Sequence, residues 1–359
     1  MFLEQLKLYN FKNFDEKIFD FDAKINCFVG YNGVGKTNVL DAIYFLALGK
    51  SYFNHNIRQI IKFEEQAFSI KGKFDFDGKT EDIHISYQLD KKKIIKRNNK
   101  TYDRLSDHVG LIPLVMISPY DRDLISESGE TRRKFIDRII SQADNQYLSS
   151  LINYQKILAQ RNRLLKYFAS NHTFDTDTLA VYDAQLANYG TMIFEKRRQF
   201  MQNFARYLKE KYAVLSEGKE SVNIRYTSEL NFKPLDQLLA QNIQKDRILQ
   251  HTSKGIHRDD FLFEINNKPI KKFGSQGQQK SFLIALKLAE FAFLKFKSNQ
   301  TPILLFDDIF DKLDEKRVEQ IIQMVNNKEF GQIFISDTHA ERTEALIKKI
   351  HQSFKLFNL

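Results

Sequence analysis

Apolar and polar residues alternate along the first third of the chain. Leu6 and Leu8 are separated by polar neighbours, a period of two that predicts a strand with one buried face. Short strands of the same kind are predicted at 18–21, 68–74, 83–88, 93–96 and 114–117. Asn98-Asn99 is a predicted hairpin turn, because asparagine tolerates positive φ. This part of the chain is therefore expected to be rich in β-structure.

The period changes to that of a helix from about residue 122 to about residue 217. Apolar residues recur at spacings of three and four around 135–140, 151–158 and 193–208. The span contains no proline, and 172–178 is its one clear polar break. We therefore predict an inserted helical lobe, which a strand at 222–226 and a helix near 235–251 connect back to the rest of the chain.

Strands and helices alternate in the last section of the chain. Strands are predicted at 261–265, 303–306 and 332–336, and helices at 278–295, 315–325 and 340–351. Such alternation is typical of a parallel sheet covered by helices on both faces. The predicted fold class is α/β, with a mixed-sheet head split into 1–120 and 245–359 around a helical insertion at 121–244.

Composition narrows the class of protein. The single cysteine, Cys27, excludes a disulfide framework and a cysteine-based zinc site among these 359 residues. No apolar run approaches 18 residues, and the N-terminal stretch lacks the pattern of an export signal, so we expect a cytoplasmic protein without a membrane partner. The net charge of +10 favours a polyanionic partner if the excess charge is clustered, and only solubility if it is scattered.

A glycine-rich segment between a predicted strand and a predicted helix carries the clearest chemistry. Gly30, Gly35, Lys36 and Thr37 satisfy the pattern G-x-x-x-x-G-K-[ST]. Glycines at positive φ turn successive N–H groups towards a triphosphate, and the helix N-terminus adds further donors. Lys36 would reach the β- and γ-phosphates, and Thr37 would hold Mg²⁺. The alternative is a glycine-rich turn without a ligand.

The predicted ATP-binding residues are those of this phosphate-binding loop and the residue after it: Gly30, Tyr31, Asn32, Gly33, Val34, Gly35, Lys36, Thr37 and Asn38.

Two carboxylates follow the apolar run Ile303–Phe306. Ligands of open α/β sheets bind at the ends of strands, so Asp307 is expected to hold Mg²⁺ through water. Asp308 points in a different direction and is expected to polarise the attacking water. An acidic turn without a ligand is the alternative.

The segment Lys272–Lys280, KFGSQGQQK, precedes and opens a predicted helix. Its serine and glycines are ordinary helix-capping residues, so a capped helix with nothing bound is one interpretation. In the other, Ser275 and the N–H of Gly277 form a second anion site. One chain does not easily bring two helix N-termini to the same γ-phosphate, whereas a second protomer does.

Together these segments resemble the ATPase heads of the ABC type, and further segments resemble the RecF family of DNA-repair ATPases. The opening LEQLKLYNFKNF, the stretch ISPYDRDLISESGETRRKFID and the stretch KGIHRDDFLF are similar to family motifs, in order along nearly the whole chain. Tyr120, Arg122 and Ile256 depart from those motifs, so we assign no role to the second and third segments. We identify no glutamine with the Q-loop function of transporter-type heads.

The resemblance implies a homodimer closed by ATP. The phosphate-binding loop of one protomer would be covered by the signature residues of the other: Ser275, Gln276, Gly277 and Gln278. His339 would contact the γ-phosphate as a switch histidine, with a surface imidazole as the alternative. The stretch 304–314 would comprise the acidic strand and the D-loop. Lys12 would touch the nucleotide, with a solvated loop lysine as the alternative. ATP and Mg²⁺ are the implied cofactors.

Two clusters of basic residues are candidates for DNA contacts. One consists of Lys91, Lys92, Lys93, Lys96, Arg97 and Lys100, and the other of Arg132, Arg133, Lys134 and Arg138. Most such clusters are only solvated faces. Phosphate contacts without a base-reading element predict weak sequence preference and strong salt dependence.

The resemblance implies an ATP-dependent DNA-binding protein of recombinational repair and replication. It would dimerise at gapped or junction DNA, aid recombinase loading together with recombination-mediator proteins, and act as a weak, DNA-stimulated ATPase. A nucleotide-switched structural ATPase of the chromosome-maintenance type is the main alternative, although the insertion is short for a long coiled coil. A transporter ATPase subunit is disfavoured because no Q-loop glutamine was identified.

Overall fold

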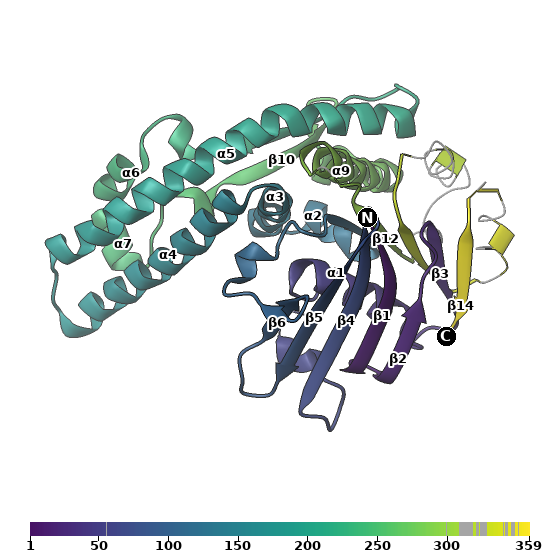
Figure 1. Cartoon of the computed structure of the whole chain (residues 1–359). Helices are drawn as coiled ribbons and strands as arrows, with labels where there is room; N and C mark the ends of the chain where they lie inside the picture. Colours follow the sequence, from purple (N-terminus) through teal and green to yellow (C-terminus); the bar gives the residue numbers. More distant parts are fainter. Residues whose placement is uncertain are drawn as a thin grey trace. The chain divides into compact units, whose positions relative to one another are not determined.

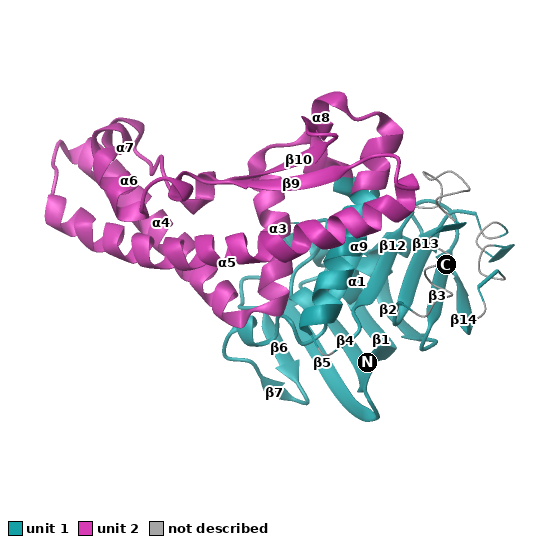
Figure 2. Cartoon of the chain, turned by 90° about the horizontal axis from the view of Figure 1, so that it is seen from above, with its two compact units in different colours: residues 1–121, 283–359 teal, residues 122–282 magenta. Residues whose placement is uncertain are grey.

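The computed structural model describes residues 1–359 except 55, 299, 309–318, 321–322, 324–328, 340, 342–343, 346–348 and 351 (Figure 1). The chain divides into two compact units, each described here by itself (Figure 2). Unit 1 comprises residues 1–121 and 283–359, and unit 2 comprises residues 122–282. No helix of the described part is both long enough and apolar enough to cross a membrane.

The first sheet of unit 1 has six antiparallel strands in the order β2-β1-β4-β5-β6-β7. Their bounds are β1 Phe2–Phe11, β2 Phe14–Asp20, β4 Ala67–Phe76, β5 Lys79–Gln88, β6 Ile94–Arg97 and β7 Lys100–Thr101. Buried and exposed residues alternate along β5, as the period of two predicts. The predicted turn is confirmed, because Asn98 and Asn99 have φ of 48° and 65° between β6 and β7.

The second sheet of unit 1 has five parallel strands in the order β14-β3-β13-β12-β8. They are β3 Ile25–Val29, β8 Leu114–Ile117, β12 Ile303–Asp307, β13 Ile333–Asp337 and β14 Phe354–Asn358. Every residue of β3, β8, β12 and β13 is buried. A parallel sheet with both faces covered requires such continuous apolar runs, so the predicted α/β class is confirmed.

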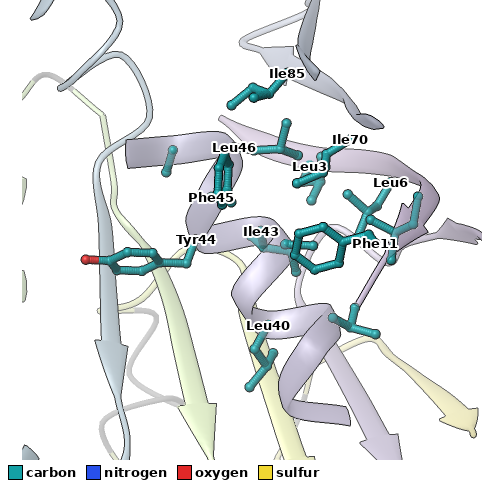
Figure 3. Close-up of a cluster of buried hydrophobic side chains, with 14 of the residues drawn as sticks. Leu3, Leu6, Phe11, Leu40, Ile43, Tyr44, Phe45, Leu46, Ile70 and Ile85 are labelled. Atoms are coloured by element: carbon teal, nitrogen blue, oxygen red, sulfur yellow. The ribbon is translucent and has the colours of Figure 1, made fainter. Parts of the chain in front are cut away.

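Helix α1, Lys36–Leu48, packs against strands of both sheets. All of its residues except Thr37 and Asn38 are buried, as expected of a helix that is apolar on every side. Figure 3 shows Ile43 and Leu46 of this helix beside side chains of the antiparallel sheet. The helix ends at Gly49, whose φ of 65° lets its N–H reach the Phe45 carbonyl at 2.8 Å. At its other end, α1 begins at Lys36, directly after the phosphate-binding loop.

Unit 2 contains long helices and a small antiparallel sheet of order β11-β10-β9. Its elements are α2 Asp123–Ser126, α3 Gly129–Ala143, α4 Asn145–Asn171, α5 Thr176–Ser216, β9 Val222–Thr227, α6 Leu235–Gln241, α7 Ile243–Leu249, β10 Asp260–Ile265, β11 Lys268–Pro269 and α8 Ile270–Phe273. Helix α9, Gln276–Lys297, begins in unit 2 and ends in unit 1. Short 3-10 helices lie at Ile57–Ile60, Leu105–Asp107, Pro119–Arg122, Glu229–Asn231 and Ile256–Arg258.

The boundary of the insertion differs from the one expected at residue 245. The compact unit continues to Phe282, because β10 pairs with β9 along its whole length instead of joining the parallel sheet. The helix expected over 235–251 is two helices, α6 and α7, that meet at Asn242. The helices expected at 315–325 and 340–351 lie for the most part outside the described residues.

Candidate nucleotide site

The phosphate-binding loop connects β3 to α1 through three glycines with positive φ. Gly30, Gly33 and Gly35 have φ of 152°, 86° and 110°. A Cβ on Gly30 would lie 2.7 Å from the Leu359 carbonyl oxygen, and one on Gly35 would lie 2.6 Å from Asn13 Nδ2. Both backbone angle and space therefore favour glycine at these two positions. Tyr31, Asn32 and Gly33 are exposed at the tip, where a ligand can approach.

Lys36 lies across this loop and is only 4% exposed. Its ammonium donates hydrogen bonds to the carbonyl oxygens of Gly30 at 2.7 Å and Tyr31 at 2.9 Å. The cation is thus held at the loop by neutral acceptors and not by a carboxylate. Phosphate oxygens would form stronger, charge-assisted bonds with the same ammonium.

Asp307, the last residue of β12, accepts hydrogen bonds from three hydroxyl groups. Its Oδ1 lies 2.8 Å from Thr37 Oγ1 and 2.8 Å from Ser336 Oγ, and its Oδ2 lies 3.4 Å from Ser118 Oγ. Burial raises the pKa of Asp307, although the three hydroxyl groups act in the opposite direction. A desolvated carboxylate beside a threonine hydroxyl is an environment that a cation would stabilise.

The ligand types at this point fit Mg²⁺, which prefers hard oxygen ligands. Thr37 and Asp307 would hold the ion, directly or through water, and the phosphates would complete its shell. Within the described ranges, no cluster of three His, Cys, Asp or Glu side chains could bind a metal by itself. Magnesium in phosphoryl-transfer enzymes is usually held by one or two protein ligands together with phosphate oxygens.

The two predicted catalytic residues follow adjacent strands. Asp308 comes directly after β12 and has φ of 45°, and its N–H lies 3.1 Å from Ser336 Oγ. His339 follows β13, is exposed, and donates its N–H to Asp337 Oδ1 at 2.9 Å. The strands β3, β13 and β12 are parallel neighbours, so the phosphate-binding loop, His339 and Asp308 all follow carboxyl ends on the same edge of one sheet. The part of the predicted acidic strand and D-loop segment that follows Asp308, residues 309–314, lies outside the described residues.

Lys12 and Asn13 form the turn between β1 and β2, next to the loop. Lys12 is not a solvated lysine, because its ammonium lies 2.7 Å from the fully buried Asp41 of α1 and its side chain is 11% exposed. Asn13 donates to the Val34 carbonyl at 3.0 Å and accepts from Asn38 Nδ2 at 2.7 Å. The role of Lys12 towards the nucleotide stays a prediction.

Sequence analysis missed Asn13, Ser118 and Ser336. Ser336 lies in a predicted strand, so its place beside Asp307 was open to inference once the parallel pairing was assumed. Asn13 and Ser118 lie in the family-like segments 3–14 and 117–137, which offered a signal, but their partners Val34 and Asp307 are distant in sequence.

The signature residues, which belong to unit 2, form a reciprocal cap at the start of α9. Ser275 Oγ accepts from the Gln278 N–H at 3.2 Å, while Gln278 Oε1 accepts from the Ser275 N–H at 2.6 Å. The Gln278 amide also donates to Glu220 at 2.6 Å. The helix cap itself is thus observed, and Ser275 and Gln276 are exposed. Their contact with a partner's nucleotide stays a prediction.

Intramolecular partners occupy two of the proposed DNA-binding residues in the first basic cluster. Arg97 makes two hydrogen bonds to Glu81, at 2.7 and 2.9 Å, which hold the pKa of that carboxyl down at about 2. Lys93 donates to the Gly49 carbonyl, and burial lowers its pKa. Lys91, Lys92 and Lys100 are exposed, so these three carry the case for a DNA contact on this hairpin.

Two arginines of the second basic cluster have partners within unit 2. Arg132 makes two hydrogen bonds to Asp260, at 2.8 and 2.9 Å, and its side chain is 12% exposed. Arg133 donates to the Asp259 carbonyl at 2.6 Å. Both arginines were predicted to bind DNA, and this stays a prediction, although both have partners within the chain that sequence proximity does not reveal.

The two family-like segments without an assigned role meet around Arg197 of α5, which is 1% exposed. Its guanidinium contacts Asp137 of α3 at 2.9 Å and Asp259 at 3.2 Å, and it donates to the Ile256 carbonyl at 2.9 Å. Tyr226 also donates to Asp259. A buried charge requires such partners, so the KGIHRDD segment is held rigidly from within unit 2.

Comparison with known proteins places the sequence of this chain in one family. Residues 2–357 match the sequence model of the RecF/RecN/SMC N terminal domain family. DNA replication and repair protein RecF of Flavobacterium johnsoniae is 60% identical over 359 residues, covering 100% of both chains. The protein of that name from Phocaeicola vulgatus is 44% identical, covering 99% of this chain and 96% of its own.

Solved structures give the same result. The recombination mediator protein RecF-ATPrS in the RecFOR pathway superposes with a TM-score of 0.89 at 27% identity, covering 99% of this chain and 96% of its own. An Smc head bound to the C-winged helix domain of ScpA has a TM-score of 0.59 at 17% identity, covering 100% and 94%, and shares the fold alone.

Proposed function

The chain is a member of the RecF family of DNA replication and repair proteins, and from this premise we propose that it is an ATP-gated DNA clamp. It binds ATP with Mg²⁺ and closes into a homodimer at gapped or junction DNA. There it aids recombinase loading together with recombination-mediator proteins. ATP hydrolysis is slow, is stimulated by DNA, and releases the dimer.

The observation that carries this proposal is the hydrogen bond between Thr37 and Asp307, at 2.8 Å. It joins the start of α1 to the end of β12, and both residue types are the magnesium ligands of phosphate-binding-loop ATPases. The ammonium of Lys36 is held on the same loop. ATP-bound forms of the related recombination mediator protein RecF support the assignment of the nucleotide.

The exposed cap at Ser275 supports dimerisation. A helix N-terminus with a serine hydroxyl is suited to an anion, and the γ-phosphate of a partner's ATP provides one. Moving an association from 1:99 to 99:1 requires about 5.5 kcal/mol. Two enclosed triphosphates with several charge-assisted hydrogen bonds each supply that much, whereas an exposed ion pair contributes about 0 to 1 kcal/mol.

Hydrolysis is assigned to the two residues that follow β12 and β13. Asp308 polarises the attacking water and His339 contacts the γ-phosphate. Mg²⁺ supplies neutralisation of charge on the phosphates. Slow turnover suits a switch, because the dimer has to persist long enough to act on DNA.

A nucleotide-switched ATPase of the chromosome-maintenance type is the second candidate, since an Smc head shares the fold. Its heads carry long coiled coils. The two longest helices here, α4 and α5, have 27 and 41 residues, which span about 40 and 60 Å at the usual helical rise. These lengths favour the repair clamp.

Binding to labelled gapped duplex tests the proposal, with and without Mg-ATP and at two salt concentrations. We expect ATP to raise the affinity and salt to lower it steeply, because phosphate contacts dominate. Equal affinity with and without ATP would contradict the clamp. Fully paired duplex of the same length is the matched control for the preference for gaps.

A further inference from the structure

The KGIHRDD segment has a second face, which lines a pocket within unit 2. The pocket has a volume of about 720 Å³ and lies between β9, the 3-10 helix Glu229–Asn231, α7 and this segment. Lys254, Gly255, Arg258 and Asp259 line it, whereas the carbonyl of the neighbouring Ile256 accepts a hydrogen bond from Arg197. Its size suits a ligand the size of a nucleotide.

The lining is cationic. Arg225, Lys245, Lys254 and Arg258 contribute four positive charges, and Glu229 and Asp259 contribute two negative ones. Asp259 is neutralised from within by Arg197, at 3.2 Å, and Lys254 pairs with Glu229. Arg258 and Lys245 are exposed, so the surplus of positive charge faces solvent. A pocket for a neutral small molecule would be mainly apolar, so an anion fits this one better.

Phe232 lies at the same pocket with 87% of its surface exposed. A flat aromatic ring beside lysine and arginine is the arrangement on which unpaired bases stack while their phosphates bind the cations. An acidic peptide would use the charges but would leave this ring without a planar partner.

The floor of the pocket is rigid. Gly255 has φ of 129°, and a Cβ there would lie 2.5 Å from Tyr154 Oη. Tyr154 also hydrogen-bonds His257 Nδ1 at 2.8 Å, and the Arg258 N–H donates to the Gly255 carbonyl at 2.8 Å. A rigid floor lowers the entropic cost of binding.

We propose that this pocket holds single-stranded nucleic acid, with backbone phosphates at Lys245 and Arg258 and one unstacked base on Phe232. The proposal rests on the DNA-binding function above and deepens it, because it places the unpaired part of a gap on unit 2. It also assigns a role in nucleic-acid binding to the residues of the KGIHRDD segment that line the pocket.

The test is fluorescence anisotropy of the full chain with a labelled thymidine oligonucleotide and with fully paired duplex, in Mg-ATP. Phe232→Ala is expected to weaken oligonucleotide binding by roughly 5- to 100-fold and duplex binding little. For the oligonucleotide, the logarithm of the affinity falls linearly with the logarithm of the salt concentration, by about 0.7 for each phosphate bound. Lys245→Glu combined with Arg258→Gln removes two phosphate contacts, so this slope is expected to become shallower by about 1.4.

Phe296→Ala and Lys156→Glu are the matched controls, because both side chains are exposed and lie outside the pocket. Unchanged ATP binding and melting temperature show that each variant folds. Pocket variants that bind the oligonucleotide like wild type, while ATP still raises duplex affinity, would overturn this inference alone. Loss of DNA binding in the wild type would overturn the proposed function instead. A polyglutamate peptide that competes as well as an oligonucleotide of equal charge would assign the pocket to an acidic protein and also overturn the inference.

Discussion

The Thr37 hydroxyl donates a 2.8 Å hydrogen bond to the Asp307 carboxylate, across 270 positions of the sequence. This bond fixes the start of α1 against the end of β12 before any nucleotide arrives. Preorganised ligands lose little entropy on binding, so the contact that orders this part of the fold would also prepare the proposed magnesium site. Two predictions concern the acidic pair at the end of β12.

Asp307→Asn is expected to keep the stability of the nucleotide-free protein but to lose most of the stabilisation that Mg-ATP provides. Burial raises the pKa of Asp307, so the charged form is costly in the nucleotide-free protein, and the amide still accepts bonds from Thr37 and Ser336. Its melting temperature without nucleotide should equal or exceed that of wild type. At a nucleotide concentration of one hundred times the wild-type Kd, binding should raise the free energy of unfolding of wild type by about 2.7 kcal/mol. The same concentration should raise that of the variant far less.

Differential scanning fluorimetry with and without Mg-ATP makes this comparison. Asp15→Asn is the control, since Asp15 is an exposed carboxylate in an ion pair with Lys62. A variant that Mg-ATP stabilises as much as wild type would remove Asp307 from the magnesium site.

Asp308→Asn is expected to bind ATP and to dimerise, but to turn over poorly. The amide keeps the shape of the side chain and loses the basicity needed to polarise water. Loss of one such group lowers kcat by roughly 100- to 10,000-fold. Phosphate release in the steady state is the measurement, and hydrolysis at the wild-type rate would mean that another group acts as the base.

Acidification is expected to destabilise unit 2 through His257. Burial lowers the pKa of His257 to about 4, and its ring bridges Tyr154 and the Thr252 carbonyl. The unfolded chain therefore binds the proton more tightly than the folded chain does. The contribution of neutral His257 to the free energy of unfolding is fully present above about pH 6.5 and is lost as the pH falls towards 4. Between about pH 7.5 and 5 the free energy of unfolding should fall by about 2 kcal/mol through this group.

Urea unfolding of wild type and His257→Gln at these two pH values isolates the effect. The variant should lose about 2 kcal/mol less than wild type on acidification, whatever its stability at neutral pH. Equal losses would show that His257 is not kept neutral in the folded protein.

Much of the architecture followed from local patterns. The strand at 114–117 has the predicted bounds, and the turn at Asn98-Asn99 has the predicted positive φ, because burial and backbone preference are properties of neighbouring residues. The phosphate-binding loop was predicted for the same reason. Pairing over long distances was not predictable: β10 joins β9 across α6 and α7, and Arg132 pairs with Asp260 at a separation of 128 residues.

The candidate site shows the same division. The sequence pattern indicated Lys36, Thr37 and Asp307, since each follows or ends a recognisable element. It did not indicate that Asp41 holds Lys12 or that Glu81 holds Arg97, because charge clusters look alike whether their partners are in solvent or within the chain.

The central claim is that two copies enclose ATP between the phosphate-binding loop of one and the serine cap of the other. Sedimentation velocity of wild type and Ser275→Arg, each with and without Mg-ATP, tests this claim most directly. Ser275→Ala is the conservative companion, since it removes the hydroxyl without adding bulk or charge.

We predict that wild type shifts to the dimer with Mg-ATP, while Ser275→Arg binds ATP with similar affinity and remains monomeric. A Ser275→Arg variant that dimerises with ATP as wild type does would contradict the account.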